Sequence, residues 1–145
     1  MSRADLAWLH PGEEIELVGR RWLDLGAALV VISLGREGAL AIWPGGSIRV
    51  PGVRVDVVDT VGAGDAFTAG LLASLHAKGS LHRDLLEHLS ASELTEVLMD
   101  ASRVAAITCT RVGADPPYRH EAEDPGAGGR RASGDRGPSA GEEGS

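Results

Sequence analysis

The stretch 57–72, VVDTVGAGDAFTAGLL, constrains the fold of this chain more than any other part of its sequence. An apolar run that ends at Val58 predicts a buried strand, and the glycines at positions 62 and 64 predict a turn with unusual backbone dihedrals. Small and large apolar residues follow, which predicts a buried helix over 65–76. A strand, a glycine turn and a helix in this order are typical of an α/β layer fold.

The turn before this helix is a candidate anion site with a carboxylate beside it. The first amide N–H groups of a helix lack intrahelical partners and lie at the positive end of its dipole, so they can hold a phosphate. Asp65 stands in the same turn, where it would stay ionised. Such a carboxylate repels phosphate, but it can accept the proton of a hydroxyl that attacks a bound phosphoryl group. The alternative is a tightly packed helix start that Asp65 merely caps.

The segments before this turn predict further strands. The continuous apolar run 28–33, ALVVIS, predicts a central parallel strand that is covered on both faces. Residues 39–43 and 48–50 flank the sequence PGGS and predict a hairpin. Residues 53–58 continue this extended character up to the glycine turn.

Helices are predicted on both sides of these strands. Residues 1–26 are predicted to form a loop and then an amphipathic helix. A short helical stretch is expected over 80–89. Ser90-x-x-Glu93 has the spacing of a capping box, which begins a helix that runs to about Cys109.

Composition narrows the class of protein. The chain has 145 residues, 43% of them hydrophobic, and a net charge of -7, which argues against a nucleic-acid partner. It has no leader pattern and no apolar run of about 18 residues, which predicts a cytoplasmic protein without a membrane partner. Its single cysteine, Cys109, is typical of a core residue. Residues 121–145 consist mostly of small, proline and charged residues, which predicts a disordered tail.

Beyond these local patterns, DTVGAGDAFTAGLL closely resembles the C-terminal signature of the ribokinase-like, or PfkB, carbohydrate kinases. Three other stretches resemble parts of the same family in the same order: VVISLGREGAL, GGSIRVPGVRVDVVDT and ASRVAAITCTRVGADPP. The opening SRADLAWLHPGE resembles fructokinase-type members. The resemblance covers about residues 2–119 and implies the C-terminal portion of a ribokinase-like three-layer α/β/α fold over residues 1–120.

The resemblance implies roles for the residues of the glycine turn. Asp65 would be the catalytic base for the sugar hydroxyl that attacks the γ-phosphate of ATP. The backbone amides of Gly62, Ala63 and Gly64 would form the anion hole that receives the phosphoryl group.

The nucleotide would lie beside a second set of residues. Ser33, Gly35 and Gly38 match the family's nucleotide-side turn, for which the alternative is a plain strand-to-hairpin connection. Ser102 lies on the helix that borders the adenine pocket in the family, or else it belongs to ordinary helix packing. ATP would act together with Mg2+.

The resemblance also implies a cation site. Asp59, and Val61 through its carbonyl, would help to bind a monovalent cation such as K+; the alternative is that Asp59 caps its own turn. Arg111 is a candidate support for this loop or for a phosphate, although an arginine near a turn is usually solvated. Ser2-x-x-Asp5 has the spacing of the family's Asn-x-x-Glu motif near magnesium and phosphate, and no role is assigned to either residue.

The implied activity is transfer of the ATP γ-phosphate to a sugar hydroxyl, with fructose as the expected sugar. The segments that hold the sugar in such a kinase do not occur in the chain, so we predict weak or no activity for it alone. An exposed sheet edge is expected where flanking strands would pair, which makes a homodimer one expectation. A non-catalytic nucleotide- or partner-binding remnant of such a kinase is the alternative.

Overall fold

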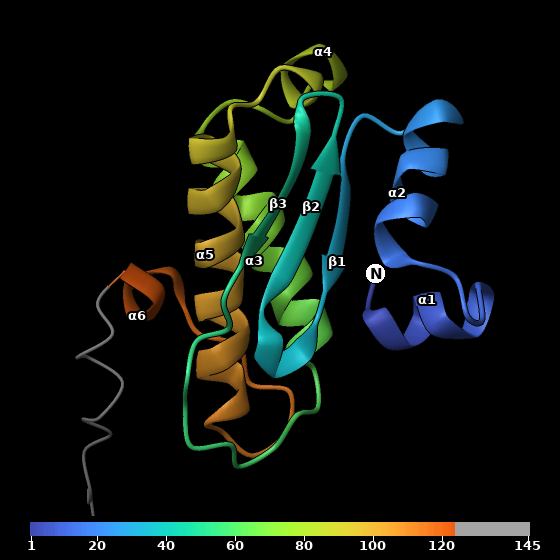
Figure 1. Cartoon of the computed structure of the whole chain (residues 1–145). Helices are drawn as coiled ribbons and strands as arrows, with labels where there is room; N and C mark the ends of the chain where they lie inside the picture. The colour runs from blue at the N-terminus through green and yellow to red at the C-terminus, as the bar shows by residue number, and fades with distance from the viewer. Residues whose placement is uncertain (124–145) are drawn as a thin grey trace, which may run out of the picture.

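Figure 1 shows a small β-sheet between two layers of helices in the computed structural model, which describes residues 1–123. The strands pair antiparallel in the order β1-β2-β3, and they are β1 (Val30–Ser33), β2 (Ala39–Trp43) and β3 (Gly46–Val50). One face packs against α1 (Arg3–Leu9) and α2 (Ile15–Asp24), and the other against α3 (Ala63–Ala77) and α5 (Ala91–Cys109). The shorter elements are the 3-10 helix η1 (Gly35–Glu37), α4 (Arg83–Glu87) and α6 (Arg119–Glu123).

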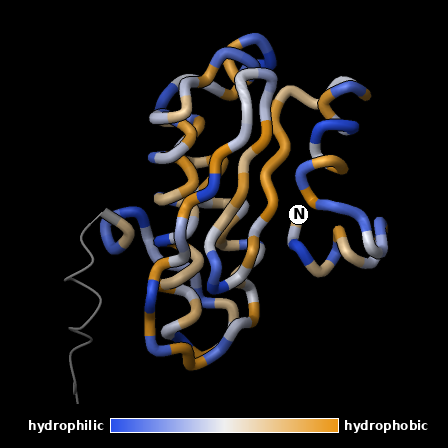
Figure 2. The backbone as a smooth tube through the Cα atoms, in the orientation of Figure 1, coloured by the Kyte–Doolittle hydropathy of each residue, from blue (hydrophilic) through white to orange (hydrophobic). Residues whose placement is uncertain are grey.

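Strand β2 supplies side chains to the hydrophobic cores on both faces of the sheet. Ala39, Ala41 and Trp43 belong to the core under α3 and α5. Leu40 and Ile42 belong to the core under α1 and α2. Successive side chains of a strand point to opposite faces, so one fully buried strand can serve both layers. The hydrophobic colour in Figure 2 accordingly runs along the strands between the helix layers.

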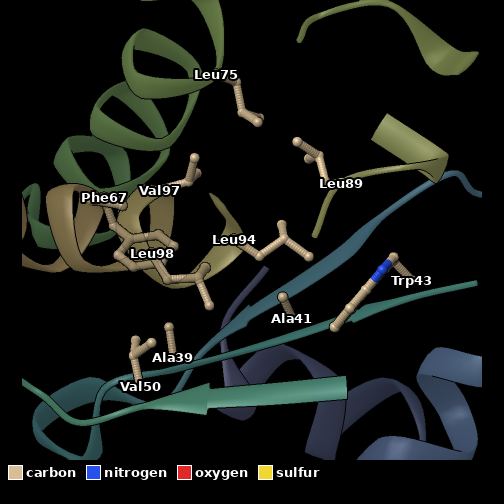
Figure 3. Packing of buried hydrophobic residues seen from close by; sticks show 11 residues of the cluster. Ala39, Ala41, Trp43, Val50, Phe67, Leu75, Leu89, Leu94, Val97 and Leu98 are labelled. Atoms are coloured by element: carbon tan, nitrogen blue, oxygen red, sulfur yellow. The ribbon is translucent and has the colours of Figure 1, made fainter. Parts of the chain in front are cut away.

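Helices α3 and α5 approach closely because a glycine lies at their contact. A Cβ atom added to Gly70 of α3 would lie 3.0 Å from both the Cα of Ala101 and the Cβ of Val104. The larger side chains of this layer fill the space towards the sheet. Figure 3 shows Phe67 and Leu98 of this core near the small residue Ala39 of β2.

The direction of the first strand differs from the sequence prediction. Residues 28–33 were expected to form a central parallel strand, but β1 pairs antiparallel with β2 and does not lie at the centre of the sheet. A turn as short as 34–38 can only return the chain antiparallel, because parallel neighbours need a long crossover. The apolar run therefore indicated burial and not direction. Among the described residues, the other edge of β1 has one parallel bridge, between Ser2 and Ser33.

The expected strand before the glycine turn is also absent. Residues 53–58 form no strand in the described chain, and the side chains of Val57 and Val58 are exposed. The backbone here bonds to a helix end instead: the N–H of Val58 donates to the carbonyl of Cys109 at 2.8 Å, and the N–H of Asp59 donates to it at 3.2 Å. Because carbonyls at a helix C-terminus lack intrahelical partners, this loop stabilises the end of α5.

A helix was missed at the start of the chain. Residues 3–9 form α1 where the sequence predicted a loop. The Ser2 hydroxyl accepts from the N–H of Asp5, and the Asp5 carboxylate accepts from the N–H of Ser2, which is a capping box. The spacing Ser-x-x-Asp was the signal that pointed to this helix.

The second capping box was predicted correctly. Ser90 and Glu93 cap the start of α5, which ends at Cys109 as expected. The predicted tail needs a correction at its start, because residues 121–123 belong to α6; the rest of that tail, 124–145, lies outside the described residues. No helix within residues 1–123 is long and apolar enough to cross a membrane.

The core under α3 and α5 yields a stability prediction. Leu98 is fully buried, so Leu98→Ala should lower the free energy of unfolding by about 2–5 kcal/mol through lost contacts and a residual cavity. Leu72 of α3 is 50% exposed, so Leu72→Ala is a control with an expected change below about 1 kcal/mol. Urea unfolding of the three proteins measures both values, and equal losses would contradict this core.

Candidate active site

The glycine turn presents the N-terminus of α3. Gly62 is the N-cap residue with a φ of 77°, a left-handed conformation that favours glycine. No described side chain caps this helix, so Asp65 does not act as its cap. The amide of Ala63 donates to the carbonyl of Thr60 at 3.2 Å, which occupies one of the amides assigned to the anion hole. The amides of Gly64 and Asp65 remain in the first turn, where helices bind anions.

Asp65 lines a hollow of about 320 Å³, here called the smaller hollow. Its lining includes Ser2, Asp5, Ser33, Gly64, Asp65 and Thr68. The Asp65 side chain is exposed and makes no hydrogen bond to a described residue, so its carboxylate oxygens are free to contact a ligand. Gly64 and Thr68 are four residues apart and share one helix face. Thr68 Oγ1 donates back to the Gly64 carbonyl at 3.0 Å.

The residues assigned to the nucleotide line a second hollow of about 890 Å³, here called the larger hollow. Its lining includes Ser33, Gly35, Gly38, Ala63, Gly64 and Ser102. The structure therefore brings together the end of β1, the turn that follows it, the start of α3 and the middle of α5. These elements are far apart in the sequence.

Ser102 has an unusual environment in the larger hollow. Its side chain is 7% exposed, and its Oγ atom has no hydrogen-bond partner among the described residues. Leaving a buried hydroxyl without a partner costs free energy. A ligand in this hollow that offered a donor or an acceptor would remove that cost, since a hydroxyl can serve either role.

The two hollows meet at the start of α3. Gly64, Ser33 and Phe67 line both of them, whereas Asp65 lines the smaller hollow alone. A ligand in the larger hollow and a ligand in the smaller one would therefore approach each other at the N-terminus of α3. This arrangement suits the transfer of an anionic group between two bound molecules.

Asp59 joins two loops beside this helix end. Its Oδ1 accepts from the N–H of Val61 at 3.0 Å, and its Oδ2 accepts from the N–H of Gly113 at 2.9 Å. These hydrogen bonds, that of Val61 first, hold the pKa of the Asp59 carboxyl below its ordinary value. Asp59 thus caps its own turn, which was one of the two alternatives. It also ties the loop before α3 to the loop after α5.

Arg111 is not a solvated arginine. Its side chain is 14% exposed and forms ion pairs with Glu121 at 2.7 Å and with Asp115 at 3.6 Å. The N–H of Tyr118 and the Arg111 guanidinium hold the pKa of the Glu121 carboxyl below its ordinary value. Arg111 therefore fixes α6 against the end of α5, a role that no local sequence pattern indicated.

Asp5, to which the sequence motif assigned no role, is a second acidic residue of the smaller hollow. Asp5 shares this lining with Asp65, and its carboxylate is held by the Ser2 hydroxyl and amide, which lower its pKa. The Ser-x-x-Asp spacing was the available signal. Among the described residues, no three histidine, cysteine or acidic side chains form a metal-binding group.

Cys109 lines the larger hollow and is half-buried. Burial, with a smaller contribution from the charge of Asp59, raises the pKa of its thiol. A raised pKa disfavours the thiolate that a nucleophilic cysteine needs. The prediction of a core residue needs a correction, because Cys109 lies at the wall of the larger hollow and not in either hydrophobic core.

Comparison with known proteins gives one family. The model of the pfkB family carbohydrate kinases matches residues 2–121. A fructokinase from Rhizobium leguminosarum bv. trifolii is 49% identical over 74 residues, which are 51% of this chain and 23% of the relative.

Two solved structures share the fold. The aminoimidazole riboside kinase of Salmonella enterica, complexed with aminoimidazole riboside and an ATP analogue, matches 84% of this chain and 39% of its own, with a TM-score of 0.64 and 31% identity. The second is a double mutant of fructokinase from Vibrio cholerae O395, bound to fructose, ADP and a potassium ion. The match covers 78% of this chain and 34% of the fructokinase chain, with a TM-score of 0.63 and 32% identity. They confirm the predicted ribokinase-like fold, of which this chain spans a part.

The hydrogen bonds of Asp59 yield a pH prediction. Asp59→Asn removes the charge and leaves one acceptor oxygen for these two N–H donors, so it should lower the melting temperature by several degrees at pH 7. The folded-state pKa is lower than the unfolded value near 3.8, so the ionised carboxylate stabilises the fold above that pH and the benefit disappears as pH falls through the folded-state pKa. The gap between the two proteins should therefore begin to narrow below about pH 4 and keep narrowing as the pH falls.

Thermal unfolding followed by circular dichroism from pH 7 to pH 3 measures this gap. Asp24→Asn is the matched control, because the Asp24 side chain makes no hydrogen bond to any residue in the described part of the chain. A gap that stayed constant with pH would show that the charge of Asp59 does not contribute.

Proposed function

The chain belongs to the pfkB family of carbohydrate kinases, and we propose that it transfers the γ-phosphate of ATP to a hydroxyl of a sugar. The observation that carries this proposal is the N-terminus of α3, where Gly64 lines both hollows and Asp65 lines the smaller one alone. A sugar in the smaller hollow and ATP in the larger hollow would meet there, as in-line phosphoryl transfer requires.

We propose fructose as the sugar. The supporting observations are the 49% identity to the Rhizobium fructokinase and the likeness to a fructokinase bound to fructose. An aminoimidazole riboside kinase of Salmonella typhimurium is 42% identical over 91 residues, and it is the alternative guide to the substrate. The fructose proposal therefore rests on the higher identity within the matched segment.

Asp65 is the proposed catalytic base. Its exposed carboxylate would accept the proton of the attacking sugar hydroxyl, which raises the nucleophilicity of the oxygen as the bond to phosphorus forms. The amides of Gly62, Ala63 and Gly64 are the proposed anion hole. The amide of Ala63 would join it once its hydrogen bond to the Thr60 carbonyl opens. These donors and the dipole of α3 would stabilise the negative charge of the transferred group.

We place ATP in the larger hollow. The unpartnered hydroxyl of Ser102 would bond to the nucleoside end. Ser33, Gly35 and Gly38 would form another part of its wall. The absence of a side chain on Gly35 lets a ligand approach the backbone there, whereas Gly38 packs against the backbone of residues 50–52.

Two cations belong to this proposal. Mg2+ would neutralise the phosphates of ATP, and the carboxylate of Asp5 in the smaller hollow is a ligand of the hard oxygen type that it prefers. K+ would bind near Asp59 and the carbonyl of Val61. The support for this site is that Asp59 is held ionised by two backbone N–H groups.

The proposal covers a part of a kinase. The chain spans 23% of the Rhizobium relative, and we propose that residues 1–120 are the C-terminal portion of the kinase domain. Catalysis needs the hydroxyl aligned with the phosphorus atom, and remote sugar contacts supply much of that alignment. We therefore expect this chain alone to turn over slowly or not at all. The proposed substrates, ATP and fructose, are small polar molecules of the kind found in the cytoplasm. A cytoplasmic location stays a prediction.

The larger hollow yields a binding prediction. Ser102→Ala removes only the unpartnered hydroxyl, so it should weaken ATP binding by about tenfold if that oxygen bonds to the nucleoside. Isothermal titration calorimetry on the whole chain measures the affinity. Ser92→Ala, at the start of α5 and outside both hollows, is the control and should bind ATP as the unchanged chain does. Equal affinities for all three proteins would remove Ser102 from the site.

The role of Asp65 yields a kinetic prediction. The test replaces the matching segment of the Rhizobium fructokinase with that of this chain and assays ATP-dependent phosphorylation of fructose. Asp65→Asn should lower kcat by about 10²–10⁴-fold, because the hydroxyl loses its proton acceptor, while the KM for ATP stays within about twofold. Asp84→Asn on α4 is the control for loss of one acid. A variant that kept most of kcat would contradict the role of base.

A further inference from the structure

We propose that Arg3 is a positioning residue for the nucleotide: by pairing with Glu37, it prevents a carboxylate in the wall of the larger hollow from repelling the phosphates. The inference rests on the proposed function, because it takes the larger hollow as the ATP site. Arg3 itself lines neither hollow, whereas Glu37 lines the larger one. Arg3 would therefore act through Glu37 and not by touching the ligand.

The geometry of the pair is specific. Arg3 Nη1 lies 2.7 Å from Glu37 Oε1, and Arg3 Nη2 lies 2.7 Å from Glu37 Oε2. Two parallel hydrogen bonds of this kind fix the orientation of both groups as well as their distance. The pair connects the first residue of α1 to the turn η1, which are 34 residues apart. It therefore holds Glu37 from outside the hollow.

A contribution to folding stability does not explain why an arginine stands in the first turn of α1 and pairs with Glu37. A cation in the first turn of a helix meets the positive end of the helix dipole, which is unfavourable. The two side chains are 38% and 60% exposed, and exposed ion pairs contribute little to folding. The location of Glu37 in the wall of a proposed anion site supplies a reason for the pair.

The charges around the larger hollow show what the pair changes. Besides Glu37, its charged lining residues are Arg36, Arg54 and Asp56, and none of these three forms an ion pair with a described residue. With Glu37 balanced by Arg3, two arginines face one aspartate, so this wall is net positive in a chain of net charge -7. Without Arg3, Glu37 counts as a full negative charge, and the four lining charges sum to zero. The pair thus decides whether the wall attracts polyphosphate.

Glu37 carries its charge at neutral pH. The hydrogen bond from Arg3 is the largest cause that holds the pKa of the Glu37 carboxyl below its ordinary value, and Arg49 adds a smaller attraction. A neutral carboxylic acid would have no need of a partner to reduce repulsion. Removal of Arg3 therefore exposes a full negative charge towards the hollow.

The experiment compares a charged with an uncharged ligand. We expect Arg3→Gln to weaken binding of ADP to the whole chain by about three- to tenfold at low salt, and to leave binding of adenosine unchanged. Isothermal titration calorimetry measures both affinities. The loss should shrink at about 0.5 M NaCl, where charges are screened. Arg20→Gln is the matched control, since Arg20 lies on α2 and lines neither hollow.

A second variant separates charge from structure. Glu37→Gln should bind ADP at least as well as the unchanged chain, and Arg3→Gln combined with Glu37→Gln should restore ADP affinity although the ion pair is absent. An unchanged ADP affinity in Arg3→Gln would overturn the inference. Equal losses for ADP and adenosine, or a double variant that stays weak, would overturn it too. If the unchanged chain binds neither ligand, the proposed nucleotide site itself is wrong.

Discussion

The close approach of α3 and α5 is the contact on which the site depends. Gly70 has no side chain, so the backbone of α5 at Ala101 reaches α3. Ser102 follows Ala101 on α5, and Phe67 lies one turn before Gly70 on α3. The side chains of Ser102 and Phe67 both line the larger hollow. The same packing that closes the core therefore sets the spacing between the buried hydroxyl and the anion-binding end of α3. A bulkier residue at position 70 would change the core and the site together.

The loops of the site are held by hydrogen bonds that cross the fold. Asp59 accepts from Gly113, and Arg111 holds Glu121, so the segment before α3 and the segment after α5 form one connected edge. In the wall of the larger hollow, Glu37 is held by Arg3. Charged side chains thus position loops that have few apolar contacts of their own.

Local sequence patterns predicted the parts of this molecule that are local in origin. The glycine turn, α3 and the capping box of α5 each depend on residues a few positions apart, and all were found. The direction of β1 was not, because an apolar run indicates burial and carries no information on pairing. The partners Asp59 and Gly113 are 54 residues apart, and no spacing rule connects them. The four nucleotide-side residues came from the family resemblance, and the shared hollow appeared only in three dimensions.

The hydrogen bonds from Val58 and Asp59 to the carbonyl of Cys109 have a consequence for dynamics. Helix ends fray, and the last turn of α5 is held in part by the loop that leads into the glycine turn. Opening of that turn would release the loop, and movement of the loop would expose the helix end. The two segments therefore form one cooperative unit in local unfolding, and their amides should exchange with solvent hydrogen at similar rates although one is a helix and the other is irregular.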